Sequence, residues 1–324
     1  MIKLMKPSSV LALAAGLVLF TSCSDDDDST PPASGPTQNI AQIVAGNASY
    51  SILNEALVAT GLNTALEASG PFTVFGPNND AFNALFDTLS LTDADGDGSR
   101  VNELAGLLGV DAVSQILLYH VVGSEILAAN VPVKAYVNTL STAAPGNRNL
   151  SLLVEKRSSG VVLNNGATVV AADIRATNGV IHGIDAVMLL PTIVSHASNN
   201  GDFSALVGAL ATADLVSVLL LPGPYTVFAP VNQAFTDISA TVETLTLDQL
   251  TEVLTYHVVA GNIQSTQLVA GPVTALNNQV FTVNVGTSVT IVDTTTGISN
   301  VVATDVQGTN GVIHVLDRVL LPVL

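Results

Sequence analysis

Four of the five histidines stand at recurring positions and could supply acid–base chemistry. His120 and His257 each follow a tyrosine, Tyr119 or Tyr256, and precede two valines. An imidazole can transfer protons or bind a ligand near neutral pH. The competing interpretation is structural, because each histidine lies between an apolar helix and an apolar pair, where buried polar groups normally find hydrogen-bond partners. The local sequence favours the structural role.

The other two histidines close a second recurring motif. His182 and His314 end Asn-Gly-Val-Ile-His segments that begin at Asn178 and Asn310, and an apolar run predicted to be a strand surrounds each of them. The structural interpretation is favoured here too. The Asn-Gly dipeptides predict a turn that needs a positive φ before the last strand.

No nucleophile motif accompanies these histidines. The sequence contains no Gly-x-Ser-x-Gly elbow, no His-Glu-x-x-His and no phosphate loop, and its one thiol is Cys23. These absences argue against an enzyme and leave a hydrolase as the minor alternative. We therefore predict no catalytic residues.

One acidic segment has the spacing of a calcium loop. Asp93, Asp95 and Asp97 place carboxylates at alternate positions with a glycine next to them, as hard oxygen ligands around a sharp turn require. A twelfth-position acid is missing, since Leu104 stands there and Glu103 falls one residue short. A degenerate calcium site and a solvated acidic turn both fit. No other cofactor is predicted.

The start of the chain reads as an export signal. Two lysines, an apolar stretch over 10–20 and two small residues lead to Cys23, in the order of a secretory signal peptide. The residues around Cys23 resemble a bacterial lipobox, which implies a lipidated cysteine after cleavage of residues 1–22. An ordinary signal peptide with a chance cysteine is the alternative. Residues 23–38, with Asp25–Asp28 and a Ser/Pro/Gly stretch, are predicted to be a tether. The four acids fit a solvated spacer or a surface-sorting signal equally well.

The composition limits which kinds of partner the protein can bind. The 324 residues include 9 basic and 26 acidic ones, a net charge of −17, so binding to nucleic acid is excluded because it requires a basic surface. Mean hydropathy is +0.52. However, no apolar run beyond residue 24 reaches the roughly 20 residues of a membrane span. Membrane attachment is therefore predicted through the lipid anchor alone.

The rest of the chain consists of two copies of one sequence repeat. Residues 50–82 and 203–235 align without a gap at an offset of 153. Asn79 recurs as Asn232, and both are predicted to cap helices. The Tyr-His and Asn-Gly-Val-Ile-His motifs follow in the same order in each copy. A period of this length is that of whole domains, here residues 39–191 and 192–324, named below the first and second repeat.

Within each repeat the patterns predict helices first and strands afterwards. In the first repeat, helices are expected over 51–66, after Asn78 or Asn79, and over 113–119, with a short strand at 72–75. Strands over 150–156, 161–163, 169–171 and 180–189 are expected to complete a sheet. Asn165-Gly166 predicts a tight hairpin in which both residues take positive φ. The fold class is α+β.

These blocks resemble the fasciclin-like domain, a module of extracellular and cell-surface proteins. The resemblance rests on Thr-Val-Phe-Ala-Pro-Val-Asn-Gln-Ala-Phe over 226–235, the Tyr-His pairs and the Asn-Gly-Val-Ile-His blocks, and covers nearly everything after residue 38. It implies two tandem domains, each a β-sandwich wedge with packed helices. It also implies adhesion or ligand binding outside the cell, and it lends the Tyr-His region some weight as an adhesion site.

Together these observations predict a secreted, lipid-anchored protein of the outer membrane or cell surface of a Gram-negative bacterium. Its expected function is non-catalytic adhesion or binding of an extracellular protein or glycan. The alternative is an envelope protein that binds a polysaccharide or small molecule in a crevice of one domain.

Overall fold

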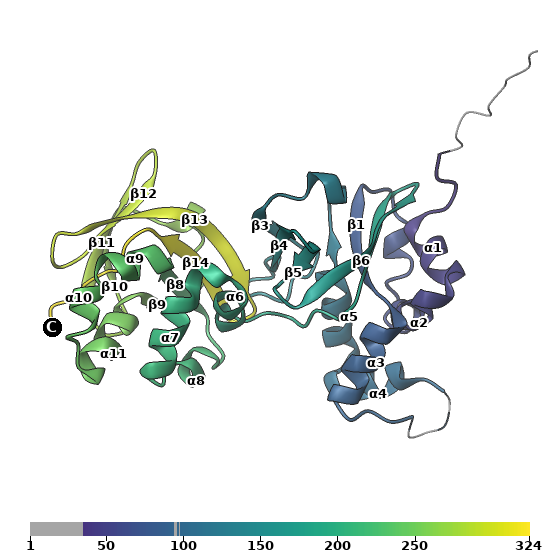
Figure 1. The fold of residues 1–324 in the computed structure, drawn as a ribbon, viewed down its shortest axis with the longest axis horizontal. Coiled ribbons are helices and arrows are strands. Elements are labelled where there is room, and N and C mark those ends of the chain that lie inside the picture. Colours follow the sequence, from purple (N-terminus) through teal and green to yellow (C-terminus); the bar gives the residue numbers. More distant parts are fainter. Residues whose placement is uncertain (1–34, 94–95, 97) are drawn as a thin grey trace, which may run out of the picture. The chain divides into compact units, whose positions relative to one another are not determined.

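The structure is a computed structural model that describes residues 35–93, 96 and 98–324. Its contacts divide the chain at residue 35, and one compact unit spans Pro36–Leu324. Cys23, the acidic run and the predicted leader lie outside the described residues. Both repeats belong to the compact unit, coloured purple to teal and green to yellow in Figure 1.

The first repeat begins with helices and ends with strands. Its α- and 3₁₀-helices are α1 (Ile40–Gly46), η1 (Ala48–Tyr50), α2 (Ser51–Ala59), η2 (Ala65–Glu67), α3 (Asn79–Thr88), α4 (Arg100–Leu108), α5 (Val110–Tyr119) and η3 (Ala128–Asn130). Its strands are β1 (Phe72–Pro77), β2 (Val121–Val122), β3 (Lys134–Asn138), β4 (Ser151–Arg157), β5 (Gly160–Leu163), β6 (Ala167–Ala176) and β7 (Gly179–Ile184).

The second repeat follows the same order. Its helices are α6 (Ile193–Asn199), η4 (Gly201–Phe203), α7 (Ser204–Thr212), α8 (Val216–Leu219), α9 (Asn232–Asp237), α10 (Ser239–Val242), α11 (Leu247–Tyr256) and η5 (Ser265–Gln267). Its strands are β8 (Tyr225–Pro230), β9 (Val258–Ala260), β10 (Gly271–Thr274), β11 (Val280–Val285), β12 (Val289–Val292), β13 (Ile298–Gly308) and β14 (Gly311–Leu316).

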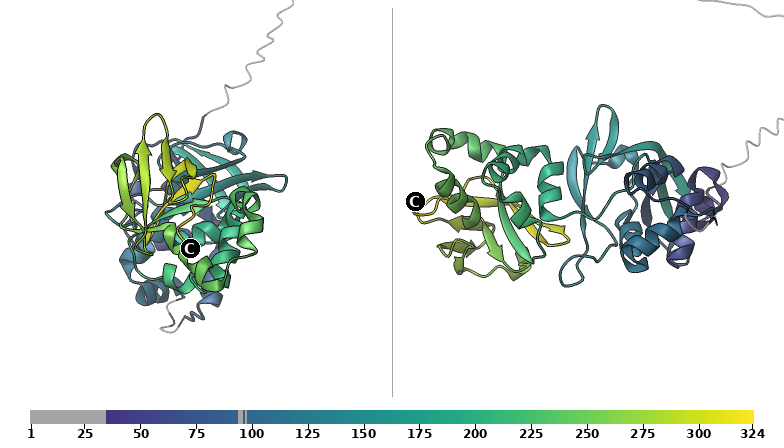
Figure 2. Two further views of the ribbon diagram at one scale, coloured as in Figure 1. Left: turned by 90° about the vertical axis from the view of Figure 1, so that its left-hand side faces the viewer. Right: turned by 90° about the horizontal axis from the view of Figure 1, so that it is seen from below.

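Each repeat builds one mixed, seven-stranded sheet. The strand order is β2-β1-β7-β6-β5-β4-β3 in the first repeat and β10-β11-β12-β13-β14-β8-β9 in the second. β1 pairs with β7, and β8 with β14, in parallel over six residues, while the other pairs are antiparallel. The chain after β3 returns to β2, where Leu140 N–H donates to the carbonyl of Val121. Each sheet therefore curls round on itself, and helices gather beside it (Figures 1 and 2).

The α+β class is confirmed, but several local expectations are wrong. The strand expected over 180–189 ends at Ile184. The helix expected over 51–66 ends at Ala59, because the chain turns at Gly61 with a φ of 71°. The hairpin after β5 turns one residue earlier than expected. Asn164 and Asn165 take the positive φ values, 46° and 53°, and Gly166 does not. Asparagine tolerates this conformation because its short side chain bonds the local backbone.

Each repeat fills its interior with aliphatic and aromatic side chains. In the first repeat one cluster lies between the helices and the sheet around Phe82 and Phe86, and another lies inside the curled sheet around Leu152 and Val154. The second repeat has equivalent clusters. In the part of the chain that the structure describes, no single helix is long and apolar enough to cross a bilayer; α4 and α5 reach that composition only together, with a 105° bend between them.

Candidate functional site

Both ring nitrogens of the histidines in the Tyr-His motifs form hydrogen bonds within the fold. His120 Nδ1 lies 2.7 Å from the carbonyl of Ile116, one turn back in α5, and so must carry the proton that it donates. Its Nε2 accepts from the backbone N–H of Met188 at 3.0 Å. The ring is only 2% exposed. It joins the end of α5 to the segment that follows β7.

His257 repeats this geometry in the second repeat. Its Nδ1 donates to the carbonyl of Val253 at 2.7 Å, and its Nε2 accepts from Leu320 N–H at 2.9 Å. Burial lowers the pKa of His120 and of His257 to about 4, because a desolvated imidazolium is unfavourable. Both imidazoles are neutral near pH 7, and their nitrogens are already occupied within the fold.

The histidines of the last strands are likewise engaged. His182 Nε2 donates to the Ile126 carbonyl at 2.8 Å, and its Nδ1 accepts from Asp173 N–H. His314 makes the equivalent bond to the Ile263 carbonyl at 2.9 Å, and burial lowers its pKa. These rings hold the loop after β2 or β9 against the sheet.

The two motif tyrosines are buried inside the curled sheets. Tyr119 Oη donates to the carbonyl of Ser151 at 2.8 Å and accepts from Asn164 Nδ2. Tyr256 Oη donates to the carbonyl of Val280 at 2.9 Å. Burial raises the pKa of both hydroxyls. Because the two bonds are equivalent, Ser151 and Val280 occupy the same place in the two repeats.

The asparagines of the Asn-Gly dipeptides each hold three backbone groups. Asn310 Oδ1 accepts from Ile193 N–H at the start of α6, while its Nδ2 donates to the carbonyls of Leu219 and Leu221. Asn178 makes the same three bonds in the first repeat. The sequence predicted only a turn here. The side chain in fact joins the first helix, the loop before the first strand and the last strand.

Replacing Asn310 by alanine is expected to destabilise the second repeat by about 3 kcal/mol or more. The change leaves one buried N–H and two carbonyls without their partner, and each such group costs about 1 to 3 kcal/mol. Urea unfolding followed by circular dichroism measures the loss. The matched control is Asn284→Ala on the exposed side of β11, where a change below about 0.5 kcal/mol is expected. Equal effects of the two substitutions would contradict this role.

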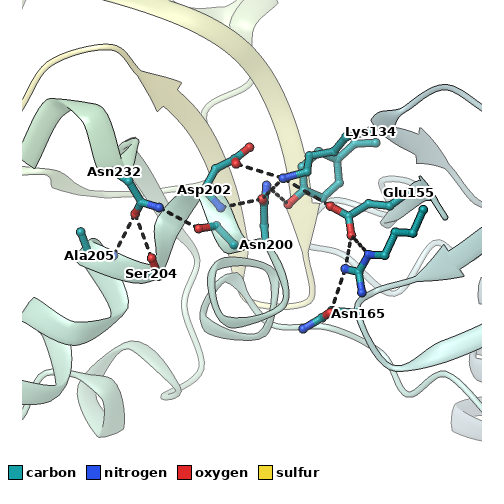
Figure 3. Close-up of polar contacts among 11 residues, drawn as sticks. Lys134, Glu155, Asn165, Asn200, Asp202, Ser204, Ala205 and Asn232 are labelled. Atoms are coloured by element: carbon teal, nitrogen blue, oxygen red, sulfur yellow. Dashed lines mark hydrogen bonds and ion pairs between the residues drawn. The ribbon is translucent and has the colours of Figure 1, made fainter. Parts of the chain in front are cut away.

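Asn79 and Asn232 do not cap their own helices, contrary to the sequence prediction. Asn78 caps α3, accepting from Ala81 N–H at 2.8 Å. Asn79 instead accepts from Ile52 N–H and donates to the carbonyl of Ala48, so it caps α2 from a distance. Asn232 bonds α7 and η4 in the same way (Figure 3). The contact spans 27 residues of sequence, which local propensity does not encode.

The glycines of the Asn-Gly dipeptides are required by close approach of backbone. A Cβ on Gly311 would lie 2.2 Å from the carbonyl oxygen of Tyr225 on β8, and one on Gly179 would lie 2.0 Å from that of Phe72 on β1. Gly311 does not adopt a positive φ, whereas Gly179 has a φ of 150°. The predicted turn chemistry is therefore wrong for Gly311.

A polar cluster that sequence reasoning missed joins the two repeats. Lys134 on β3 forms ion pairs with Glu155 at 3.3 Å and with Asp202 of the second repeat at 3.0 Å (Figure 3). Its Nζ also donates to Asn200 Oδ1, and Asn200 Nδ2 donates to the hydroxyl of Tyr136. His196 of α6 meets the Tyr136 ring edge-on with the ring centroids 5.6 Å apart. Burial lowers the pKa of His196 to about 4.

The outward side of β4 is covered by the second repeat. Ser151 Oγ accepts from Gln307 N–H on β13 at 2.9 Å. Leu153, whose neighbours Leu152 and Val154 point into the core, is 0% exposed although it lies on the opposite face. Tyr136 packs against the core of the second repeat. The interface is thus a sheet face of one repeat against α6 and β13 of the other.

Beside this interface lies a hollow of about 390 Å³ lined mainly by amides. Its polar side chains are Asn138, Asn147, Arg148, Asn149, Gln264, Asp305 and Gln307. Amide and guanidinium donors together with one carboxylate can bind the hydroxyl groups of a sugar or a small polar ligand.

The acidic segment stays a prediction as a calcium site. Asp93 Oδ2 accepts from Gly98 N–H at 3.1 Å, and Glu103 lies in the first turn of α4, which begins at Arg100. Asp95 and Asp97 lie outside the described residues. Among the residues that the structure describes, no three His, Cys, Asp or Glu side chains group as a metal site.

The geometry defines a class of protein: two like modules in tandem, whose shared motif residues fasten backbone segments together. The comparisons with known proteins agree. The fasciclin domain family model matches residues 48–191 and 201–322, and the chain belongs to this family. Fasciclin domains are typical of cell-adhesion and surface-binding proteins, which are generally non-enzymatic.

Individual relatives match one or both repeats. A Synechocystis protein is 46% identical over 136 residues, covering 40% of this chain and 73% of the relative. Human periostin is 28% identical over 269 residues, covering 82% of this chain but only 30% of its own length. A solved FAS1 domain pair from the insect cell adhesion molecule fasciclin I aligns with a TM-score of 0.49 and 20% identity, over 85% of this chain and 98% of that one.

Proposed function

We propose that this protein is a lipid-anchored surface protein that binds an extracellular protein or glycan without catalysing a reaction. The observation that carries the proposal is the double match to the fasciclin family together with the engagement of its motif residues. His120, His257, His182 and His314 use both ring nitrogens in holding the fold. Binding is therefore assigned to the outer surfaces of the repeats.

The anchor is proposed at Cys23. It is the sole cysteine of the chain and follows an apolar leader and two small residues. Two or more acyl chains hold a protein stably on a bilayer. Removal of residues 1–22 takes away Lys3 and Lys6, which changes the charge from 9 − 26 to 7 − 26, or −19. A chain this acidic gains little attraction from an anionic membrane surface, so the acyl groups must supply the attachment.

Replacing Cys23 by serine is expected to abolish acyl labelling and to leave the protein at its unprocessed length, with residues 1–22 still attached. Globomycin, which blocks the lipoprotein signal peptidase, is expected to leave the parent protein at its unprocessed length. Ser22→Ala is the matched control and should keep the anchor, because a small residue remains before the cysteine. Unchanged processing of Cys23→Ser, or the absence of acyl label on the parent protein, would refute the anchor and leave the binding proposal intact.

The binding proposal is tested by capture of surface material. Purified protein on beads is expected to retain a defined protein or glycan from cell-surface and matrix extracts. Acid-unfolded protein on matched beads should not retain it. Recovery of the same material on both kinds of bead would contradict specific binding.

A second candidate function is binding of a glycan or small polar molecule, favoured by the amide-lined hollow beside Arg148 and Asp305. A glycan array separates the two functions, since this candidate predicts one glycan class whose signal falls at least about tenfold in Arg148→Ala, the loss of one or two charge-assisted hydrogen bonds. A signal that Arg148→Ala leaves unchanged would place the glycan elsewhere on the surface.

A further inference from the structure

The two repeats differ in what covers the outward face of the sheet. In the first repeat, Leu153 of β4 is fully buried beneath the second repeat, and Ser151 is 1% exposed. The bonds from Tyr119 and Tyr256 make Ser151 and Val280 equivalent, so Thr282 of β11 corresponds to Leu153. Thr282 is exposed. The outward face of the sheet is therefore covered in the first repeat and exposed in the second.

The open face carries uncharged residues on three neighbouring strands. Thr282 pairs with Val292, and Val292 pairs with Ile298, so the three residues lie side by side across β11, β12 and β13. Val280 is 44% and Ile298 59% exposed. We name the surface formed by Val280, Thr282, Asn284, Val292 and Ile298 the uncovered face. Exposed β-branched residues on neighbouring strands form a ready contact surface.

The elements of the second repeat that cover this face have counterparts in the first repeat, and these counterparts are exposed. In the second repeat, α6 and the turn after it supply His196, Asn200 and Asp202 to the interface. Ile40 and Ile193 are equivalent because Asn178 and Asn310 accept from their N–H groups.

That equivalence places Ile43, Asn47 and Ser49 where His196, Asn200 and Asp202 stand. Ser49 is exposed, and Ile43 and Asn47 are partly exposed. We name these three residues the α1 side.

Residue pairs that meet at the interface between the repeats have counterparts on the uncovered face and the α1 side, and both members of a pair differ there. Sheet register places Pro272 where Tyr136 stands and Ala270 where Lys134 stands. The Lys134–Asp202 ion pair thus becomes Ala270 opposite Ser49.

The contact between Tyr136 and His196 becomes Pro272 opposite Ile43, an apolar pair. The position of Gln307 holds Arg175, which already pairs with Glu125 at 3.5 Å. A contact between the two open surfaces would bury no unpaired charge at these positions, which is the condition for favourable association.

We propose that the uncovered face of one molecule binds the α1 side of a second copy of this chain, head to tail. The contact reuses the geometry that joins the two repeats within one molecule. Since the two surfaces differ and each copy carries both, every added copy presents a free surface for the next, so the contact builds assemblies larger than a dimer. The inference names a partner without reference to the external ligand, so its failure leaves the proposed binding function standing.

Sedimentation velocity tests the proposal on residues 36–324, the compact unit, so that neither acyl chains nor the leader can cause association. The parent is compared with three variants. The parent is expected to show a mass that rises with concentration beyond that of a dimer. Thr282→Arg on the uncovered face and Ser49→Arg on the α1 side should each stay monomeric. Thr212→Arg at the end of α7 is the matched control and should associate like the parent.

Mixing the two monomeric variants decides the geometry. Each retains one intact surface, so an equimolar mixture is expected to form a dimer and no larger species. Thermal unfolding confirms that each variant is folded. A parent that stays monomeric up to its solubility limit overturns the proposal. Loss of association in Thr282→Arg but not in Ser49→Arg also overturns it, because that result assigns a symmetric face-to-face pair.

Discussion

Lowering the pH from about 7.5 to about 4 is expected to destabilise both repeats strongly through their buried histidines. The pKa of His120, His196 and His257 is about 4 in the folded chain, against 6.5 when unfolded. Each ring is neutral in the native state and uses that form, with Nε2 of His120 and His257 accepting a backbone hydrogen bond. Protonation removes this acceptor and places a cation in the core.

The direction of the effect follows from proton binding. Between pH 6.5 and about 4 the unfolded chain binds protons that the folded chain does not, so the free energy of unfolding falls as the pH falls. Above pH 6.5 neither state binds them, and these groups add no pH dependence. Each histidine is expected to lower the free energy of unfolding by roughly 3 kcal/mol across the window, because a difference of one pKa unit between the two states corresponds to about 1.4 kcal/mol. Urea unfolding at stepped pH values measures the slope.

His257→Gln isolates one histidine. Glutamine can donate and accept but does not titrate in this range, so this variant should be less stable than the parent near pH 7. Its dependence of unfolding free energy on pH should be shallower by about one proton. A variant slope equal to that of the parent would show that His257 is not protonated on unfolding in this window.

Gly311→Ala is expected to destabilise the second repeat by more than about 3 kcal/mol or to prevent it from folding. The added Cβ would lie 2.2 Å from the Tyr225 carbonyl oxygen and 3.0 Å from the backbone carbon and nitrogen of that residue. Relief requires β14 to separate from β8, to which six residue pairs join it in parallel. Circular dichroism during urea unfolding measures the loss.

Gly208→Ala is the matched control for this substitution. Gly208 lies inside α7, where a Cβ meets nothing within 4 Å. The change is expected to stabilise the helix by up to about 1 kcal/mol. Loss of stability in both variants would mean that the second repeat does not tolerate added methyl groups in general, and the close approach at Gly311 would not be the cause.

The sequence revealed the repeat and the class because those features depend on local pattern. Apolar spacing placed α5 and most strands, and the recurrence of three motifs marked two similar domains. The role of Asn178 was not predictable, since it bonds residues 110 to 138 positions away. A turn signal describes only the neighbouring backbone, whereas this side chain is selected by segments that meet in the folded chain.

The contact between the repeats escaped prediction for a related reason. Lys134, Tyr136 and Asp202 belong to no motif, and in the other repeat their positions hold Ala270, Pro272 and Ser49. The only indication in the sequence was that these positions differ between the two repeats. Aligning the repeats by sheet register shows that these differing residues lie at the contact in one repeat and on an exposed surface in the other.

The parallel pairing of β1 with β7 has a mechanical consequence if the protein is held by the anchor proposed at Cys23. Tension along the chain pulls β1 from its amino end and β7 from its carboxyl end. In a parallel pair these two ends lie at opposite ends of the neighbouring strands, so the load shears the strands past each other. The inter-strand hydrogen bonds over six residue pairs then resist together and do not open one by one. β8 and β14 repeat the arrangement, and each module can therefore transmit pulling force before it unfolds.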